Sequence, residues 1–137
     1  MAKLRKKTNF RQALTLSEKT MVAGKNAEQN EEIIKQAGKK EFVLHTKMPG
    51  SPFVNIKTGK ESKERVNKHD IRDAALFCAV YSQVWKKAKK KKDVEVHVFL
   101  GQDIYKEKGM PLGTFGVKKF KKITVKKSEI EKYGGRR

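Results

Sequence analysis

The residues with the clearest chemical potential in this sequence are lysines gathered in two runs. Lys86–Lys92 holds six lysines in seven residues, and Lys118–Lys127 holds six more, interleaved with apolar side chains such as Phe120. Lysine ammonium groups bind phosphates as point charges, and an aromatic ring among them can stack on a nucleobase or pack inward from a strand. One charge run is well explained as a solvated face, but two in a short chain favour nucleic acid. The predicted phosphate contacts are Lys86, Lys87, Lys89, Lys90, Lys118, Lys119, Lys121 and Lys122.

The overall composition favours the same class of partner. The chain has 137 residues, with 34 Lys and Arg against 15 Asp and Glu, and a formal net charge of +19. A surface this basic favours a polyanion, with nucleic acid first and an anionic membrane surface second. Lys outnumbers Arg by 28 to 6. Because Arg is the usual bidentate reader of guanine edges, this ratio favours contacts to the nucleic-acid backbone over reading of base sequence.

A second group of candidates lies between Gly24 and Ser51. Asn26 is a plausible helix N-cap, and the free N–H groups after it, with Lys25, Gln29 and Asn30, could hold a phosphate or a base edge. For Asn26 alone, plain capping is the better interpretation. The predicted hairpin that follows carries three further candidates for contacts with such a ligand, His45, Lys47 and Ser51. A buried, hydrogen-bonded core histidine is an equally good interpretation of His45.

Other constellations fail as catalytic or metal sites. The three histidines share no zinc-binding spacing, and Cys78 lies on an apolar stripe, which is typical of a buried structural thiol. Gly59-Lys60 lacks the Ser or Thr and the upstream glycine of a P-loop. We therefore predict no enzyme, no metal and no cofactor. No apolar run approaches the roughly 20 residues of a membrane span, and no signal-peptide core is present, so a cytoplasmic location is expected.

The elements that must position these residues follow from hydropathy patterns. We expect a hairpin within residues 13–24, a helix after Asn26, strands at 41–48, 53–57, 94–100, 114–118 and 122–126, and a loop at 58–68. The strongest pattern is an apolar helical stripe from Asp70 to Ala88, on which Tyr81 and Trp85 are predicted to be core residues. The order predicts an α+β fold, with a mainly antiparallel sheet and two helices, the longer at about 68–90.

These elements fit one domain. Residues 1–12 are basic and poor in apolar side chains, so a basic N-terminal arm is expected there. Residues 13–127 carry the periodic patterns and form the predicted domain. Residues 128–137 end in Gly-Gly-Arg-Arg and are predicted to be a flexible tail.

Four segments together resemble a known family. GKNAEQNEEI from Gly24 is similar to the G-R-[ND]-x-x-Q-N-[ED] opening of the NFACT-R domain, the RNA-binding domain of ribosome quality-control factors of the NEMF/RqcH type. PGSPFVNIKTG (49–59), DAALFCAVYSQVW (73–85) and LGTF (112–115) resemble further family segments in the same order. Lys25 replaces the usual Arg, so the positive charge is kept but the bidentate hydrogen bonding of a guanidinium is lost. Val43 stands where many members have Trp.

The resemblance implies a non-enzymatic RNA-binding module that acts on ribosomes, ribosomal RNA or tRNA. It does not extend to the alanine-tailing role of the large factors, because that role depends on domains outside this segment. Two alternatives stay open. A nonspecific DNA or polyanion binder fits the lysine-rich composition. A nucleic-acid-modifying enzyme is the less favoured alternative, and its only support is the polar cluster of Asn26, Gln29, Asn30, His45 and Ser51.

Overall fold

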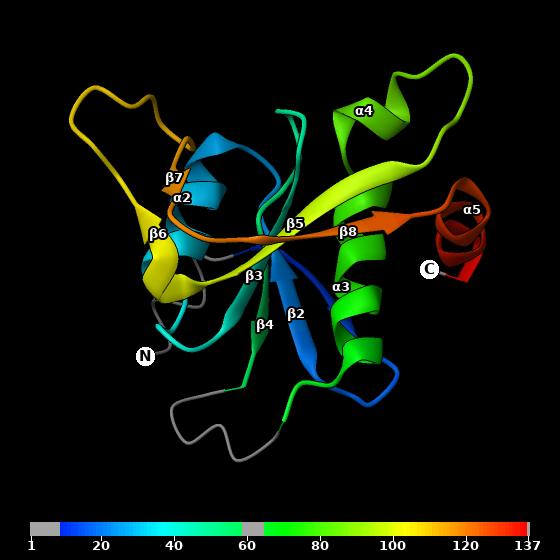
Figure 1. The fold of residues 1–137 in the computed structure, drawn as a ribbon, viewed down its shortest axis with the longest axis horizontal. Coiled ribbons are helices and arrows are strands. Elements are labelled where there is room, and N and C mark those ends of the chain that lie inside the picture. The colour runs from blue at the N-terminus through cyan, green and yellow to red at the C-terminus, as the bar shows by residue number, and fades with distance from the viewer. Residues whose placement is uncertain (1–8, 59–64, 137) are drawn as a thin grey trace.

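A six-stranded antiparallel sheet forms the centre of the molecule, as the computed structural model of residues 9–58 and 65–136 shows (Figure 1). The predicted α+β class and mainly antiparallel sheet are confirmed. Neighbouring strands lie in the order β1-β2-β4-β3-β5-β8. Their bounds are β1 Arg11–Leu14, β2 Thr20–Ala23, β3 Phe42–Thr46, β4 Val54–Lys57, β5 Val94–Leu100 and β8 Lys121–Val125.

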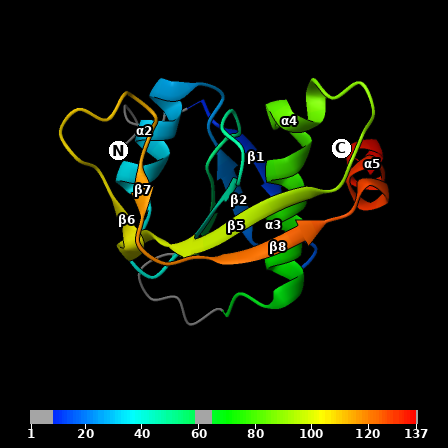
Figure 2. The same cartoon turned by 45° about the horizontal axis from the view of Figure 1, so that its top comes forward.

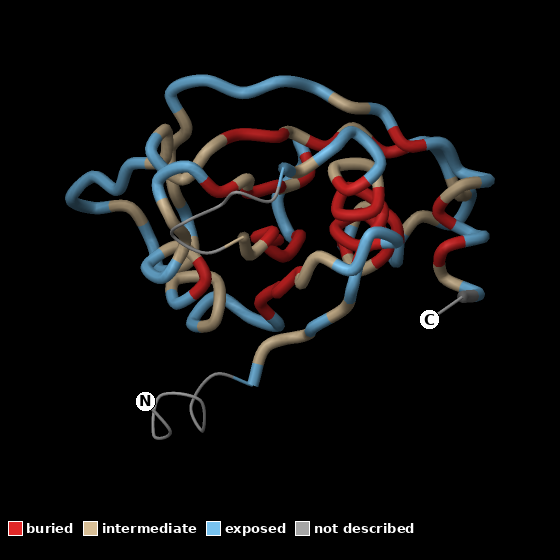
Figure 3. The backbone as a smooth tube through the Cα atoms, turned by 90° about the horizontal axis from the view of Figure 1, so that it is seen from below, coloured by how far each residue is buried: buried red, intermediate tan, exposed pale blue. Residues whose placement is uncertain are grey.

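The helices cover the two faces of this sheet unequally. Helix α3 (Lys68–Val80) packs on one face with α5 (Lys127–Arg136) beside it, and together with the strands they bury the larger apolar core (Figures 1 and 2). Helix α2 (Ala27–Gln36) packs on the other face through Ile33, against Val22, Val43, Phe53 and Phe99. Buried backbone accordingly concentrates in α3 and the central strands (Figure 3).

Strand β5 shows why the two faces differ. Val94, Val96 and Val98 alternate onto the α3 side and are at most 7% exposed. The intervening residues Glu95 and His97 point to the opposite side and remain partly exposed. Alternation along a pleated strand gives this division directly, as the sequence predicted.

The predicted helix at 68–90 is wrong in its length. The structure ends α3 at Val80 and begins a short helix, α4 (Gln83–Lys86), after Ser82. The Ser82 hydroxyl donates to the Ala79 carbonyl oxygen at 2.7 Å and accepts from the Trp85 N–H at 3.3 Å, so it caps a new helix. The Gln83 N–H donates to Gly50 of the β3–β4 turn at 2.9 Å. Local capping and this tertiary bond therefore override the continuous apolar stripe.

The predicted flexible tail is also corrected. Residues Lys127–Arg136 form α5, whose Ile130 is fully buried and whose Tyr133 is 7% exposed in the core beside α3. The Arg72 Nε donates to the Glu129 carboxylate at 3.0 Å and ties the two helices together. At the other end, β1 begins at Arg11, inside the predicted arm, while residues 1–8 of that arm lie outside the described residues.

A small second sheet joins β6 (Ile104–Tyr105) to β7 (Gly116–Val117) after a 3-10 turn, Gly101–Asp103. Its second strand, β7, is shorter than the strand predicted at 114–118. The Glu31 carboxylate of α2 accepts from the Lys106 Nζ at 2.6 Å and from the Gly113 N–H at 2.7 Å. Burial would raise the pKa of Glu31, but these bonds outweigh it and hold that pKa below its usual value. The loop between β6 and β7 is thereby fixed against α2.

None of the helices in residues 9–58 and 65–136 has the length and apolar composition needed to cross a membrane.

Candidate nucleic-acid interface

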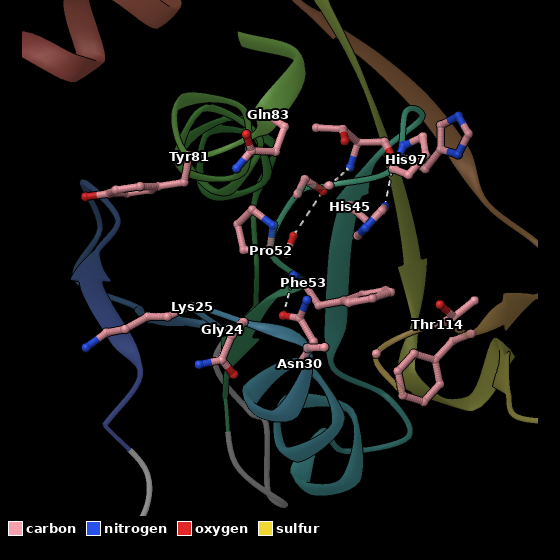
Figure 4. Close-up of a pocket in the computed structure, with 18 of the residues that line it drawn as sticks. Gly24, Lys25, Asn30, His45, Pro52, Phe53, Tyr81, Gln83, His97 and Thr114 are labelled. Atoms are coloured by element: carbon pink, nitrogen blue, oxygen red, sulfur yellow. Dashed lines mark hydrogen bonds between the residues drawn. The ribbon is translucent and has the colours of Figure 1, made fainter. Parts of the chain in front are cut away.

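A cavity of about 590 Å³ opens where the N-terminus of α2, the β3–β4 turn, α4 and the β6–β7 loop meet (Figure 4). Four basic side chains line it: Arg11, Lys25, Lys47 and Lys86. No Asp or Glu occurs among the described residues of its lining, although the chain has 15 of them. The cavity is therefore positively charged without an internal counter-ion.

The start of α2 shapes one wall of this cavity through its own hydrogen bonds. The Asn26 side chain accepts from the Gln29 N–H at 2.9 Å, and the Gln29 side chain accepts from the Lys25 N–H at 3.0 Å. The Asn30 Oδ1 accepts from the Phe53 N–H at 3.1 Å, which joins α2 to β4. A Cβ at Gly24 would lie 2.3 Å from that Oδ1, so only glycine allows this close crossing. The predicted capping role of Asn26 is confirmed.

Aromatic and histidine rings follow one row across the sheet, on the face opposite α3. His45 of β3 pairs with His97 of β5, and His97 pairs with Lys122 of β8. The His45 ring lies 4.3 Å from the Phe53 ring between centroids, and His97 stacks on Phe120 at 4.1 Å with planes 14° apart. Phe120 is 46% exposed, so its ring lies at the surface and not in the core.

His45 presents a defined hydrogen-bonding edge. Its Nδ1 lies 2.7 Å from the Thr46 carbonyl oxygen, and because a carbonyl only accepts, Nδ1 carries the proton of that bond. Burial lowers the pKa of His45 below its usual value, and nearby His97 acts in the same direction. The neutral ring therefore keeps Nε2 as an acceptor. Both sequence interpretations of His45 hold in part, since the ring is hydrogen-bonded and also lines the cavity.

Beside it, the Glu95 carboxylate accepts a hydrogen bond from the His97 Nε2 at 3.0 Å. This bond is the main reason that the pKa of Glu95 lies below its usual value, and Lys47 and Lys122 add to the effect. The pair fixes the His97 ring against Phe120.

Ser51 is placed differently from the prediction. It lines the cavity, but its side chain is only 6% exposed, and its hydroxyl accepts from the Thr46 N–H at 3.1 Å. Its role in this structure is to hold the β3–β4 turn. The neighbouring Cys78 is fully buried, and burial raises the pKa of its thiol to about 12, as expected for a structural cysteine.

The structure brings together about half of the predicted residues. Seven line the cavity: Lys25, Asn26, Asn30, His45, Lys47, Ser51 and Lys86. Gln29 lies just behind it as a capping residue. The exposed lysines 118, 119, 121 and 122 surround Phe120 at the start of β8, next to His97. Lys87, Lys89 and Lys90 are exposed between α4 and β5, outside the lining.

Sequence reasoning missed several residues at the cavity, including Phe53, Gln83, His97, Thr114 and Phe115, and the clearest cases are Arg11 and Tyr81. The Arg11 guanidinium lies 4.1 Å from the centroid of the Tyr81 ring and donates to the Gly24 carbonyl oxygen at 3.2 Å. Tyr81 was predicted as core because it continues the apolar stripe, yet it is partly exposed and lines the cavity. Trp85, by contrast, is buried as predicted. Arg11 carried no signal beyond its charge, since only the folded strand places it beside Tyr81.

The fold and the cavity together define a small basic α+β module with an aromatic, cation-lined face. Residues 7–119 match the NFACT protein RNA binding domain family, so the chain belongs to this family. Its structure is similar to the C-terminal part of the fibronectin/fibrinogen-binding protein from Streptococcus suis, with a TM-score of 0.74 and 22% identity. The match covers 90% of this chain and 48% of that one, so this chain spans about half of that structure's length. No curated protein matches the sequence.

Proposed function

We propose that this domain binds RNA through the cavity and the adjoining row of rings on the sheet, without catalysing a reaction on it. RNA binding is the role that describes its family. The observation that carries the proposal here is the cavity lining, in which four cations and several aromatic rings occur without a carboxylate among the described residues. Ammonium and guanidinium groups bind phosphates, and aromatic rings stack on bases.

The open part of the sheet extends this surface beyond the cavity. Phe120 lies flat on His97 with exposed lysines on both sides in sequence, so a base stacked there would have cations beside its phosphates. Exposed aromatic rings on a sheet are a common means of binding unpaired RNA. The predicted residues Lys118, Lys119, Lys121 and Lys122 are proposed to act here.

Ribosomal RNA or tRNA, on or near the ribosome in the cytoplasm, is the proposed partner. The resemblance of the Gly24 and LGTF segments to ribosome quality-control factors supports this choice. Lysine-dominated contacts also fit structured RNA, which proteins recognise largely by shape and backbone. Crosslinking of the tagged protein to cellular RNA, followed by sequencing, tests it. Enrichment of ribosomal RNA or tRNA is expected, and a flat transcriptome-wide profile would refute this partner.

A nonspecific polyanion binder is the second candidate, favoured by the exposed lysines between α4 and β5 that lie outside the cavity. Competition among tRNA, ribosomes, single strands and duplex DNA at about 150 mM salt separates the two. Equal, steeply salt-dependent binding to all four would support this candidate and contradict specific RNA binding.

The absence of catalysis is also part of the proposal. In the described part of the chain, no group of three or more His, Cys, Asp or Glu side chains is placed to hold a metal ion. Within the cavity lining, no described carboxylate pairs with His45 as an acid or base. Incubation of labelled tRNA with the protein, with and without divalent metal, should leave the RNA unchanged. Turnover that His45→Ala abolishes would overturn this part.

A further inference from the structure

The cavity has two ends with different chemistry. In Figure 4, Lys25 and Tyr81 lie on one side and His97 and Thr114 on the other, with Phe53 between them. Arg11 and Lys86 belong to the Tyr81 side, because both approach its ring. We call these the cationic end and the aromatic end.

At the cationic end, like charges gather around one ring. The Arg11 guanidinium lies 4.1 Å and the Lys86 Nζ 5.6 Å from the Tyr81 ring centroid, and Lys25 adjoins Gly24, the residue that Arg11 bonds. Charges of one sign this close repel each other. Without a described carboxylate in the lining, an anionic ligand is the group that would relieve this repulsion.

The aromatic end offers rings and unused hydrogen-bonding groups. Phe53 forms its floor, with His45 against the ring and Phe115 edge-on to it at 5.5 Å. Two polar groups of the described lining at this end have no hydrogen-bond partner in the structure, the Asn30 Nδ2 and the Thr114 hydroxyl, whereas Gln83 lies on α4 beside Tyr81 (Figure 4). Both donors and acceptors are among them, which suits the polar edge of a flat heterocycle.

We propose that the cavity receives one unpaired nucleotide of a bound RNA, with its phosphate at the cationic end and its base at the aromatic end. The cavity volume of about 590 Å³ lies within the roughly 300–1,000 Å³ of small-ligand sites. The cavity can therefore hold a single nucleotide but not an RNA double helix. A paired base is stacked inside its duplex and cannot enter without being extruded. The inference rests on the proposed RNA binding and specifies the nucleotide state that the domain selects.

Three RNA hairpins of identical stem test this inference, each closed by the same non-nucleotide linker so that the loop supplies no unpaired base. The first is fully paired, the second carries one bulged nucleotide, and the third carries one unpaired nucleotide at its 3′ end. Fluorescence anisotropy at fixed salt should show about tenfold tighter binding to at least one of the unpaired forms, since one stacked base contributes on this order. The second and third hairpins distinguish an internal from a terminal source of the nucleotide.

Variants at Thr114 test whether a preference for hairpins with an unpaired nucleotide comes from the cavity. Thr114 is exposed at the cavity wall, so Thr114→Trp should fill the aromatic end without disturbing the core. The preference for the unpaired hairpin should disappear in Thr114→Trp and persist in the matched control Thr114→Ser. The melting temperature should stay the same in both variants, so that a lost preference cannot come from unfolding.

Adenosine 5′-monophosphate provides a readout that needs no long RNA. Titrated at millimolar concentration into isotope-labelled protein, it should shift the NMR signals of His45 and Thr114, and Thr114→Trp should suppress those shifts. Equal affinity for all three hairpins, or a preference unchanged by Thr114→Trp, would overturn the inference and leave RNA binding intact. Failure to bind any of the hairpins, tRNA or ribosomes would instead overturn the proposed function on which it rests.

Discussion

The two faces of the six-stranded sheet are built from the same strands but meet different surroundings. On the α3 face, fully buried residues such as Leu44, Val54 and Val96 pack against α3 and α5. On the α2 face, only the part near Val43 and Phe99 is buried under the helix and the β6–β7 loop. The remainder carries His45, His97 and Lys122 in one row across three strands.

This difference assigns stability to one face and ligand binding to the other. Burial of aliphatic side chains is the main stabilising contribution in a small domain, and the α3 face supplies most of it. The α2 face can therefore leave polar and aromatic side chains partly exposed. The buried polar groups that the structure describes still have hydrogen-bond partners. Substitutions on the two faces should separate folding from binding.

The largest expected effect belongs to the α3 face. Leu44→Ala removes a fully buried side chain and should lower the free energy of unfolding by about 2–5 kcal/mol. Thr124→Ala, at an exposed position of β8 beside Glu95 on the other face, should change it by no more than about 0.5 kcal/mol. Urea denaturation followed by circular dichroism measures both. Similar losses for the two variants would contradict the assignment of stability to the α3 face.

Removal of lysine charges beside Phe120 tests, through RNA affinity, whether the α2 face is the binding face. Replacing Lys118, Lys119, Lys121 and Lys122 with Ala should make the slope of log K against log salt shallower by about 3, because four phosphate contacts to unpaired RNA are lost. The matched control replaces four other exposed lysines: Lys68 at the start of α3, Lys126 just before α5, and Lys127 and Lys132 in α5. Both variants lower the net charge equally. Equal slopes would show that total charge, not its position beside Phe120, determines affinity.

Much of the fold could be predicted where a local pattern decides the structure. The β5 alternation, the β1–β2 hairpin and the Asn26 cap each depend on neighbours within a few residues, and all three are present. The end of α3 before Ser82 could not be predicted from the sequence. Ser82 caps α4 through the Trp85 N–H, and the hydrogen bond from the Gln83 N–H to Gly50, which is distant in sequence, supports this second helix. Helix α5 likewise depends on docking against α3 through Arg72 and Glu129.

The candidate site likewise contains residues that local sequence could predict and residues that only long-range contacts bring together. The candidates in the Gly24–Lys47 segment could be proposed because their types and spacing are unusual in sequence, and all of them except Gln29 line the cavity. Arg11 and Tyr81 were missed because their contact joins residues 70 positions apart, between a strand and the end of a helix. Ser51 was overestimated, since its type suggested a surface contact and burial turned its hydroxyl inward.

A smaller effect is expected from the exposed ring of the α2 face. Phe120→Ala should weaken binding to single-stranded RNA by about 1–3 kcal/mol, since one base loses its stacking partner. Leu14→Ala is the control, because Leu14 is 61% exposed on β1 and does not line the cavity. Isothermal titration calorimetry compares them, and equal losses would show that exposed apolar area, not stacking on the Phe120–His97 pair, supports binding.

The smallest effect concerns His45 and the pH dependence of stability. Burial lowers the pKa of His45 in the folded chain below its usual value of 6.5, so the unfolded chain binds its proton more readily. Stability from this residue is therefore complete above pH 6.5 and falls as the pH drops below that value. Carboxylates such as Glu41 and Asp70 have lowered pKa values, whose effect on stability begins only near and below their usual values of 4.5 and 3.8.

Urea denaturation from pH 7.5 to 5.5 should thus show a decrease in the free energy of unfolding. His45→Phe should reduce this decrease, and His69→Gln, at an exposed histidine, should leave it unchanged. A loss that is the same in His45→Phe as in the unaltered chain would mean that the open face of the sheet does not hold this ring neutral.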